Sequence, residues 1–520
     1  MVTILDTTLR DGAQGEGVVF SLEDKRKIIR ALDDLGVHYI EAGNPASNPK
    51  DAELFRFVSG GMKLKHAKIV AFGSTCRAGT PAKDDASLMA LASCGADTVS
   101  LFGKGSLFQV RHVLRTTPEE NLRMIAESVE YLKARGLTVF YDAEHFFDGY
   151  MEDREYALSA VRAAEDAGAD LIVLCDTNGG TLPEDVERIV RDTISALRTP
   201  VSIHCHNDAG LATAATLAAV HAGATQVQGT INGYGERCGN ANLCQVIPNL
   251  ALKMGIECLP QGNLARITGT ARFVSEIANL SLDERSPYVG ASAFAHKGGM
   301  HVDGVLKDHR AFEHVDPASV GGHRRFLLGE MSGRGTIMTK IASIAPDLER
   351  NSEDVAAIMQ MLKDLESTGY SFEDAEESFT LRVLDALQRR KKFFTVEDFN
   401  VISRKPENDR NAQAYVKISV GGVMEINADE GNGPINALDL ALRKALTKFY
   451  PCLTGMWLKD FKVRVVNTQG TASSVRVQIE STDGDLVWHT VGVSANIIEA
   501  SFIALIDSID YRLMKHTGNL

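Results

Sequence analysis

His204 and His206 are the residues whose type and spacing first suggest chemistry. They close the run Val201-Ser202-Ile203-His204-Cys205-His206-Asn207-Asp208, in which apolar residues give way to polar ones. Such a run predicts a strand that ends at a loop. Successive side chains of a strand point to opposite faces, so the two imidazoles share one face and Cys205 takes the other. Such a pair can hold a divalent metal, although a lone His-x-His is more often two hydrogen-bonded core histidines.

The first 250 residues alternate strand and helix patterns, and these elements must position the two histidines. The candidate strands are Thr3–Leu5, Tyr39–Ala42, Lys68–Phe72, Thr98–Leu101, Thr138–Tyr141, Leu171–Cys175, Val201–His204 and Gln226–Thr230. Ser21, Pro118 and Pro183 open three of the intervening helices with capping or first-turn chemistry. Eight such units fit an α/β fold of the (β/α)8 TIM-barrel type. An open doubly wound sheet is the alternative, but no Gly-x-Gly-x-x-Gly follows the first strand.

Polar and titratable residues follow five of these strands at the same end. The five segments are Asp6–Gln14, Asp142–His145, Asp176–Gly180, His204–Asp208 and Asn232–Asn240. In a (β/α)8 barrel, functional residues gather at the C-terminal ends of the strands. Hydrogen-bonded core histidines would not predict this coincidence. It therefore favours a metal site.

The ligand types predict which metals such a site would take. His204, His206 and one carboxylate form a mixed nitrogen and oxygen set, which suits Mg²⁺, Mn²⁺ or Zn²⁺ and leaves positions open for a substrate. Asp11 is the best carboxylate because it follows the first strand directly, although alone it would be read as a helix cap or loop acid. Asn240 can add a neutral oxygen.

The rest of the chain predicts two further parts. Residues 1–265 form the barrel, residues 266–405 a helical linker region and residues 406–520 an α+β regulatory domain. The polar segment Asn400–Gln413 is interpreted as a linker. From Ala414 onward, two strand-then-helix units of similar plan predict a pseudo-symmetric module. It fits an effector or assembly domain, and a plain dimerisation domain fits it equally well.

The amino-acid composition limits which classes of partner and which cellular compartment we expect. Lys and Arg number 55 against 68 Asp and Glu, a formal net charge of −13, which argues against nucleic-acid and anionic-membrane partners. We see no apolar stretch of membrane-span length and no leader before the first strand. The eight cysteines are scattered, and several lie within apolar runs, as expected of reduced cysteines in a cytoplasmic protein.

Three segments carry a family resemblance. Asp6–Gln14 (DTTLRDGAQ), Ile203–Asp208 (IHCHND) and Asn232–Asn240 (NGYGERCGN) resemble motifs of the 2-isopropylmalate, homocitrate and citramalate synthase family. The resemblance runs nearly end to end. Longer matches are similar to the citramalate synthase branch: Phe140–Tyr150 (FYDAEHFFDGY), Val173–Pro183 (VLCDTNGGTLP), Val227–Pro248, Ser292–His301 (SAFAHKGGMH) and Ala428–Leu440 (ADEGNGPINALDL). The C-terminal module resembles the amino-acid-sensing regulatory domain of that family.

The resemblance implies a metal-dependent condensation of acetyl-CoA with a 2-oxo acid. The metal, held by Asp11, His204 and His206, would chelate the 2-oxo acid and make its ketone electrophilic. Arg10 would stabilise the alkoxide that forms. Thr177 would hydrogen-bond the substrate carboxylate, and the strand-end residues Gln14 and Asp142 are assigned to substrate binding.

Glu144 and His301 match the acid/base positions of the family. One removes a methyl proton from acetyl-CoA and the other directs hydrolysis of the thioester, and the sequence leaves open which does which. In homodimers of this family the histidine at the position of His301 comes from the partner subunit. The resemblance therefore implies a homodimer with a shared active site.

The chain also departs from the citramalate-like pattern at three places. Asn44 stands where an aromatic residue is usual, Ser106-Leu107 where a tryptophan is usual, and Phe312 where a tyrosine is common. Asn44 and Ser106-Leu107 follow barrel strands, so we expect them to line the oxo-acid pocket and to enlarge or polarise it. Asn44 is therefore counted among the substrate-binding residues.

The favoured reading is condensation of acetyl-CoA with pyruvate to (R)-citramalate and CoA, as in isoleucine biosynthesis. The first alternative is the same reaction on a larger or more polar 2-oxo acid such as 2-oxoisovalerate. The others are a lyase that runs the reverse cleavage, and an amino-acid-binding sensor without strong catalysis.

Overall fold

The computed structural model describes residues 1–327, 334–349, 352–403, 411–466 and 473–518. They form two compact units, Met1–Phe294 with His314–Arg324 and Ala295–Glu313 with Arg325–Leu520. Each unit is described by itself. No helix among the described residues has both the length and the apolar character needed to cross a membrane.

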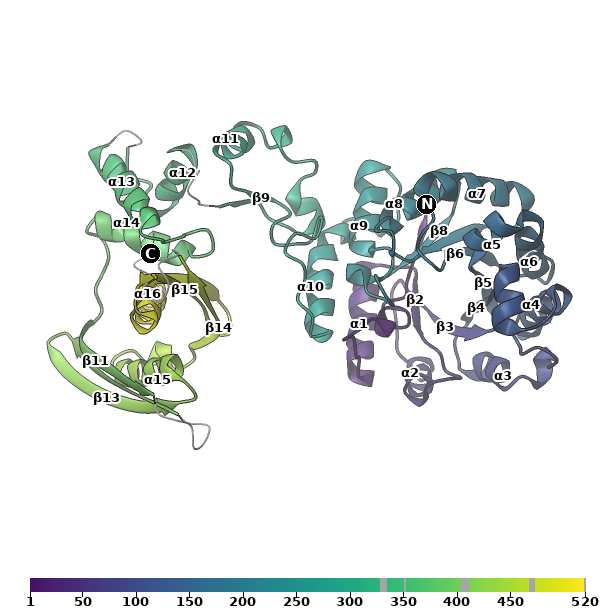
Figure 1. The fold of residues 1–520 in the computed structure, drawn as a ribbon, viewed down its shortest axis with the longest axis horizontal. Helices are drawn as coiled ribbons and strands as arrows, with labels where there is room; N and C mark the ends of the chain where they lie inside the picture. Colours follow the sequence, from purple (N-terminus) through teal and green to yellow (C-terminus); the bar gives the residue numbers. More distant parts are fainter. Residues whose placement is uncertain (328–333, 350–351, 404–410, 467–472, 519–520) are drawn as a thin grey trace. The chain divides into compact units, whose positions relative to one another are not determined.

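Eight parallel strands of the first unit close into a barrel in sequence order, with β8 paired to β1. Figure 1 shows barrel strands such as β3, β5 and β6 with the helices of this unit around them. The strands are β1 (Thr3–Asp6), β2 (Tyr39–Gly43), β3 (Lys68–Ser74), β4 (Thr98–Lys104), β5 (Thr138–Glu144), β6 (Leu171–Asp176), β7 (Val201–Cys205) and β8 (Gln226–Gly229). The predicted (β/α)8 barrel is confirmed. Seven strands run one to three residues beyond their predicted ends. The ladder hydrogen bonds thus continue into the polar residues that follow the apolar runs.

Helices and short turns connect the strands and cover the barrel. They are η1 (Gly12–Gln14), α1 (Leu22–Leu35), α2 (Pro49–Ser59), η2 (Ala82–Asp84), α3 (Ala86–Ser93), η3 (Gln109–Leu114), α4 (Pro118–Lys133), α5 (Phe146–Glu152), α6 (Arg154–Asp166), α7 (Pro183–Ala196), α8 (Ala212–Ala222), η4 (Ile231–Gly233), α9 (Leu243–Pro248), η5 (Asn249–Lys253), η6 (Asn263–Arg266), α10 (Ile267–Ile277) and η8 (Pro317–Val320). The three predicted helix starts are confirmed. Ser21 forms a capping box with Asp24, and Pro118 and Pro183 open α4 and α7 with acidic residues in the first turn.

The second unit begins with a helical part, as predicted. Its elements are β9 (Ala295–His296), α11 (Gly299–Lys307), η7 (His309–Ala311), β10 (Arg325–Phe326), α12 (Arg334–Ile344), α13 (Glu353–Ser367) and α14 (Glu376–Ala386). The helices α12, α13 and α14 bury a small apolar core of their own, which includes Ile341, Ile358 and Phe379.

The C-terminal part repeats one plan twice, as the sequence predicts. The elements are β11 (Thr395–Ser403), β12 (Ala412–Val420), β13 (Val423–Gly431), α15 (Pro434–Thr447), η9 (Pro451–Leu453), β14 (Trp457–Val465), β15 (Val475–Thr482), β16 (Val487–Ser494) and α16 (Ile497–His516). Each three-stranded antiparallel sheet precedes one long helix that packs on it.

The interpretation of Asn400–Gln413 as a linker is wrong at both ends. Residues up to Ser403 belong to β11 and those from Ala412 to β12, and the two strands pair antiparallel. Residues 404–410 lie outside the described residues. The error has a physical cause: β11 exposes most of its side chains, so its polar residues resemble a loop in composition.

Candidate active site

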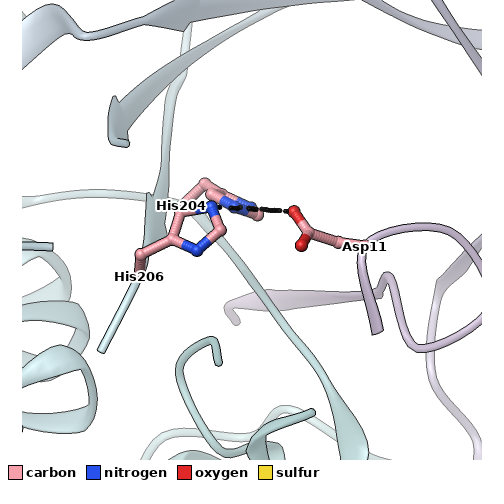
Figure 2. A group of neighbouring side chains, drawn as sticks. All are labelled: Asp11, His204 and His206. Carbon is pink, nitrogen blue, oxygen red and sulfur yellow. Dashed lines mark ion pairs between the residues drawn. The ribbon is translucent and has the colours of Figure 1, made fainter. Parts of the chain in front are cut away.

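Asp11, His204 and His206 meet at the C-terminal end of the barrel (Figure 2). Asp11 follows β1, His204 lies in β7, and His206 comes directly after that strand. Their ligand atoms all lie within 4.8 Å of one another, and the three residues are buried. The Oδ2 atom of Asp11 is 3.4 Å from Nε2 of His204 and 3.8 Å from Nε2 of His206. The predicted grouping of one carboxylate and two imidazoles is therefore present.

Neighbouring groups set the proton positions on the two histidines. Nδ1 of His204 lies 3.1 Å from the amide oxygen of Gln228 in β8, so it carries the proton and turns Nε2 toward Asp11. Burial and the charge of His204 lower the pKa of His206 to about 4, which keeps that imidazole neutral at pH 7. Burial lowers the pKa of His204, but the bond with Asp11 and the charge of Asp11 outweigh it and raise that pKa. The Nε2 atoms of both rings face Oδ2 of Asp11.

Asp11 is held as a carboxylate. Burial by itself raises the pKa of this carboxyl, but the Arg10 guanidinium and the bond with His204 hold it well below its usual range. Nη1 of Arg10 donates to Oδ2 of Asp11 at 2.9 Å, and Nδ2 of Asn240 donates to Oδ1 at 3.0 Å. The negative charge that a cation requires is therefore in place.

Two buried atoms beside the triad have no partner among the described residues. They are Oδ1 of Asn240 and Nδ1 of His206. A buried oxygen without a donor costs free energy unless something else satisfies it. Together with two imidazoles and a carboxylate, the amide oxygen completes a donor set that fits a divalent cation.

Arg10 is locked in place by Glu41, a residue that the sequence reasoning missed. Nε of Arg10 donates to Oε2 of Glu41 at 2.6 Å, and Thr7 Oγ1 donates to the same oxygen at 2.7 Å. The guanidinium also lies 3.8 Å from the centre of the Phe72 ring. The available signal was an acidic side chain inside the apolar run of β2, where Glu41 is fully buried.

A pocket of about 110 Å³ opens beside the triad. Eight of the predicted site residues line it: Arg10, Asp11, Gln14, Asp142, Glu144, Thr177, His204 and His206. The aromatic rings of Phe72 and Phe102 form one wall, stacked with centres 4.9 Å apart. Arg237 and Glu236, from the loop after β8, complete the lining with Cys175.

The polar lining of this pocket presents both donors and acceptors. Thr177 Oγ1 accepts from the backbone N–H of His145 at 2.8 Å, so its own hydroxyl proton stays available to a ligand. Burial and the nearby charge of Glu41 raise the pKa of Asp142 to about 8, so this group is largely a neutral acid at pH 7. Glu144 forms an ion pair with Lys104, a second residue that the sequence reasoning missed.

Asn44 lies in a neighbouring pocket of about 380 Å³, which shares Arg10, Gln14 and Phe72 with the first. Its side-chain oxygen accepts from the backbone N–H groups of Ala46 and Ser47. The amide that replaces the usual aromatic residue thus closes a local turn.

Ser106 and Leu107, which we expected in the oxo-acid pocket, are not among the residues that line the pocket beside the triad. Ser106 donates to Glu152 of α5 at 3.2 Å, and Leu107 packs with Val110 and Tyr156. Both residues follow the end of β4, where the chain has already turned into the layer of helices.

His301 lies in α11 of the second unit, with its ring stacked 4.1 Å from that of Phe312. It is exposed in the described chain. The other predicted residues belong to the barrel unit, whereas His301 belongs to the second unit.

Three family models match successive parts of the chain. The HMGL-like model matches residues 1–274, the homocitrate synthase post-HMGL domain-like model residues 288–369, and the LeuA allosteric (dimerisation) domain model residues 373–513. The metal triad lies within the first of these.

Curated relatives match over nearly their whole length. The (R)-citramalate synthases of Geobacter sulfurreducens and Aquifex aeolicus are each 49% identical over 518 residues, covering 99% of this chain and 98% of theirs. A probable 2-isopropylmalate synthase of Methanopyrus kandleri is 33% identical, covering 98% of both chains.

Proposed function

The chain belongs to the (R)-citramalate synthase family, and we propose that it condenses acetyl-CoA with pyruvate to give (R)-citramalate and CoA. The observation that carries this proposal is the small pocket beside the triad, which pairs metal-binding residues with a wall of two phenyl rings. The full-length similarity to (R)-citramalate synthases supports it. Production of (R)-citramalate would place the enzyme in isoleucine biosynthesis.

We assign the metal to Asp11, His204 and His206, with Asn240 as a further oxygen donor. The mixed donor set suits Mg²⁺, Mn²⁺ or Zn²⁺. When bound, such a cation supplies a Lewis acid that polarises the ketone of the 2-oxo acid. Its identity is a matter for metal analysis of the purified protein.

The side chains of the pocket would bind the substrate, transfer the proton and stabilise the alkoxide. Thr177 and Gln14 bind the substrate carboxylate, and the neutral acid of Asp142 donates a hydrogen bond to the substrate. Glu144 takes a proton from the methyl group of acetyl-CoA, and the electrons of that C–H bond form the new C–C bond to the ketone carbon. The ketone π electrons move to its oxygen, where Arg10 stabilises the alkoxide until it is protonated.

The thioester is then hydrolysed. Water adds to the thioester carbonyl, the C–S bond breaks, and the sulfur leaves with a proton as the CoA thiol. His301 is proposed to direct this water from the second unit of the partner chain. The assignment of the two steps to Glu144 and His301 can be exchanged, and single-turnover kinetics of the two variants would separate them.

The stacked rings of Phe72 and Phe102 favour pyruvate over a branched oxo acid. They border a pocket of about 110 Å³, in which a methyl group leaves more free space than an isopropyl group. The alternative substrate, 2-oxoisovalerate, was motivated by Asn44 and Ser106. Ser106 bonds Glu152, and the side-chain oxygen of Asn44 closes a loop, so neither contact polarises the pocket beside the triad.

The test is CoA release, followed with a thiol reagent, across a panel of 2-oxo acids. We expect a pyruvate optimum that disappears when a chelator removes the metal. An optimum at 2-oxoisovalerate would replace pyruvate in the proposal. If no oxo acid releases CoA, the chain is instead a lyase or a sensor, and incubation with a hydroxyacyl-CoA distinguishes these two.

The LeuA-type domain indicates a dimer with an effector site. We propose isoleucine as the effector, because it is the end product that the reaction would serve. The eight cysteines are free, and five of them are buried, which supports a reducing, cytoplasmic location.

A further inference from the structure

Lys104 and Glu144 end two neighbouring strands of the barrel in register. Their Cα atoms are direct partners in the β4–β5 ladder, as are those of Phe102 and Asp142 two residues earlier. Residues two apart in a strand share a face. Lys104 therefore follows Phe102 on the pocket face, just as Glu144 follows Asp142.

The backbone around Lys104 is fixed on two sides. Asn121 of α4, itself fully buried, donates from Nδ2 to the carbonyl oxygen of Lys104 at 2.9 Å. The N–H of Gly105 donates to the carbonyl of Glu144 at 2.9 Å. The ammonium is thus carried by a rigid strand end rather than by a surface loop.

The two arginines that line this pocket are already committed. Arg10 is bound by Glu41 and Asp11, and Arg237 donates to Asp208 and to the carbonyl of Thr177. The ammonium of Lys104 pairs with Oε2 of Glu144, with the two side chains 16% and 23% exposed. No described residue bonds Oε1 of Glu144, so this oxygen is left to accept a proton.

We propose that Lys104 is a positioning residue for the condensation, holding the Glu144 carboxylate in place with one oxygen free beside the pocket. This inference rests on the proposed function, because it assigns Lys104 a role through the proposed base. A mere surface ion pair would contribute little, since exposed pairs are typically worth about 0–1 kcal/mol.

The position needs a cation because its surroundings are acidic. The acidic side chains of Asp11 and Glu236 line the same pocket as Glu144. Without Lys104, the carboxylate would turn toward Arg10 or toward solvent, and a general base works only within hydrogen-bond reach of the proton that it removes. The loss should therefore fall on the chemical step rather than on binding of the oxo acid.

The experiment compares K104M, K104R and K133M in the full-length, metal-loaded protein. We expect kcat of K104M to fall about 10- to 100-fold, the range of a weakened general base, with KM for pyruvate and the affinity for Mn²⁺ unchanged. K104R keeps a cation and should recover most of kcat. K133M is the matched control, because Lys133 of α4 pairs with Asp170 at the opposite end of the barrel, and its kcat should equal that of the unmodified protein.

Three results would overturn the inference: K104M retaining kcat within twofold, K104R as slow as K104M, or a loss confined to KM or to Mn²⁺ affinity. If K104M lowers the melting temperature, K104Q replaces it. Failure of the proposed function looks different. In that case neither the unmodified protein nor K133M releases CoA with any oxo acid, and the Lys104 variants cannot be slower than the unmodified protein.

Discussion

Arg10, Asp11 and Glu41 form one connected charge network at the mouth of the barrel. Glu41 holds Nε of Arg10, and Arg10 in turn donates to Asp11. Each charge is buried and compensated by the next, so removing one leaves its neighbour unpaired in a site of low polarity. At the scale of single residues, we therefore expect variants here to alter metal binding and catalysis together.

Replacing Asp11 with Asn keeps the shape of the side chain but removes its charge. We expect Mn²⁺ affinity to fall at least about 100-fold, more than is typical for loss of an outer contact, with CoA release lost in parallel. Calorimetric titration with Mn²⁺ measures the metal affinity, and the thiol assay measures CoA release. D34N, at an exposed acid of the same barrel, is the control. Unchanged Mn²⁺ binding in D11N would show that the metal lies elsewhere.

Replacing Asp142 with Asn tests its protonation. Burial, helped by the charge of Glu41, raises the pKa of Asp142 to about 8, so the group is neutral below pH 8 and gains a negative charge above it. That charge repels an anionic oxo acid, and KM for pyruvate should rise about tenfold by pH 9. In D142N, KM should stay flat from pH 7 to 9. Steady-state kinetics from pH 7 to 9 give KM for pyruvate in both proteins. If KM changes with pH in the same way in D142N as in the unmodified protein, Asp142 is not the group that titrates.

At the scale of elements, the strands of the barrel position the site, and the sequence predicts them well. Apolar runs followed by polar residues located all eight strands, and barrel closure then fixed which strand ends meet. Lys104 was missed because its partner, Glu144, is set by the register of two strands forty residues apart. Glu41 was missed because one acid in an apolar run has no periodic signal. The strand β11 was missed because its exposed faces are polar.

Gly149 tests how closely α5 must approach the end of β4. A Cβ at this position would lie 2.3 Å from the carbonyl oxygen of Gly105 and 2.7 Å from Cα of Ser106, and neither backbone atom can move alone. We expect G149A to cost about 1–3 kcal/mol of unfolding free energy, as overpacking does, and to lower kcat by shifting the strand end. Urea denaturation measures the cost. G269A, at an open position in the first turn of α10, should be neutral or stabilising. Equal stability of the two variants would contradict the close contact.

At the scale of the whole molecule, the residues that we propose for catalysis belong to two units. The barrel supplies the metal triad, Arg10 and Glu144, whereas His301 lies in the unit that also carries the LeuA-type domain. An effector that binds this domain could therefore act on catalysis through the placement of His301. H204A should abolish turnover and leave isoleucine binding intact, which calorimetry can measure on the same protein.

Subunit complementation tests whether the active site is shared. D11N and H301A are each expected to be inactive as homodimers. If His301 serves the barrel of the partner chain, a mixed dimer has one site with both defects and one intact site. Random reassociation makes half of the dimers mixed, so activity should recover to about a quarter of the unmodified value. Native mass spectrometry of differently tagged chains confirms that mixed dimers form. If they form and activity does not return, His301 serves its own chain, because every site of the mixed dimer then carries one defect. If the H301A homodimer is itself active, His301 has no part in the reaction.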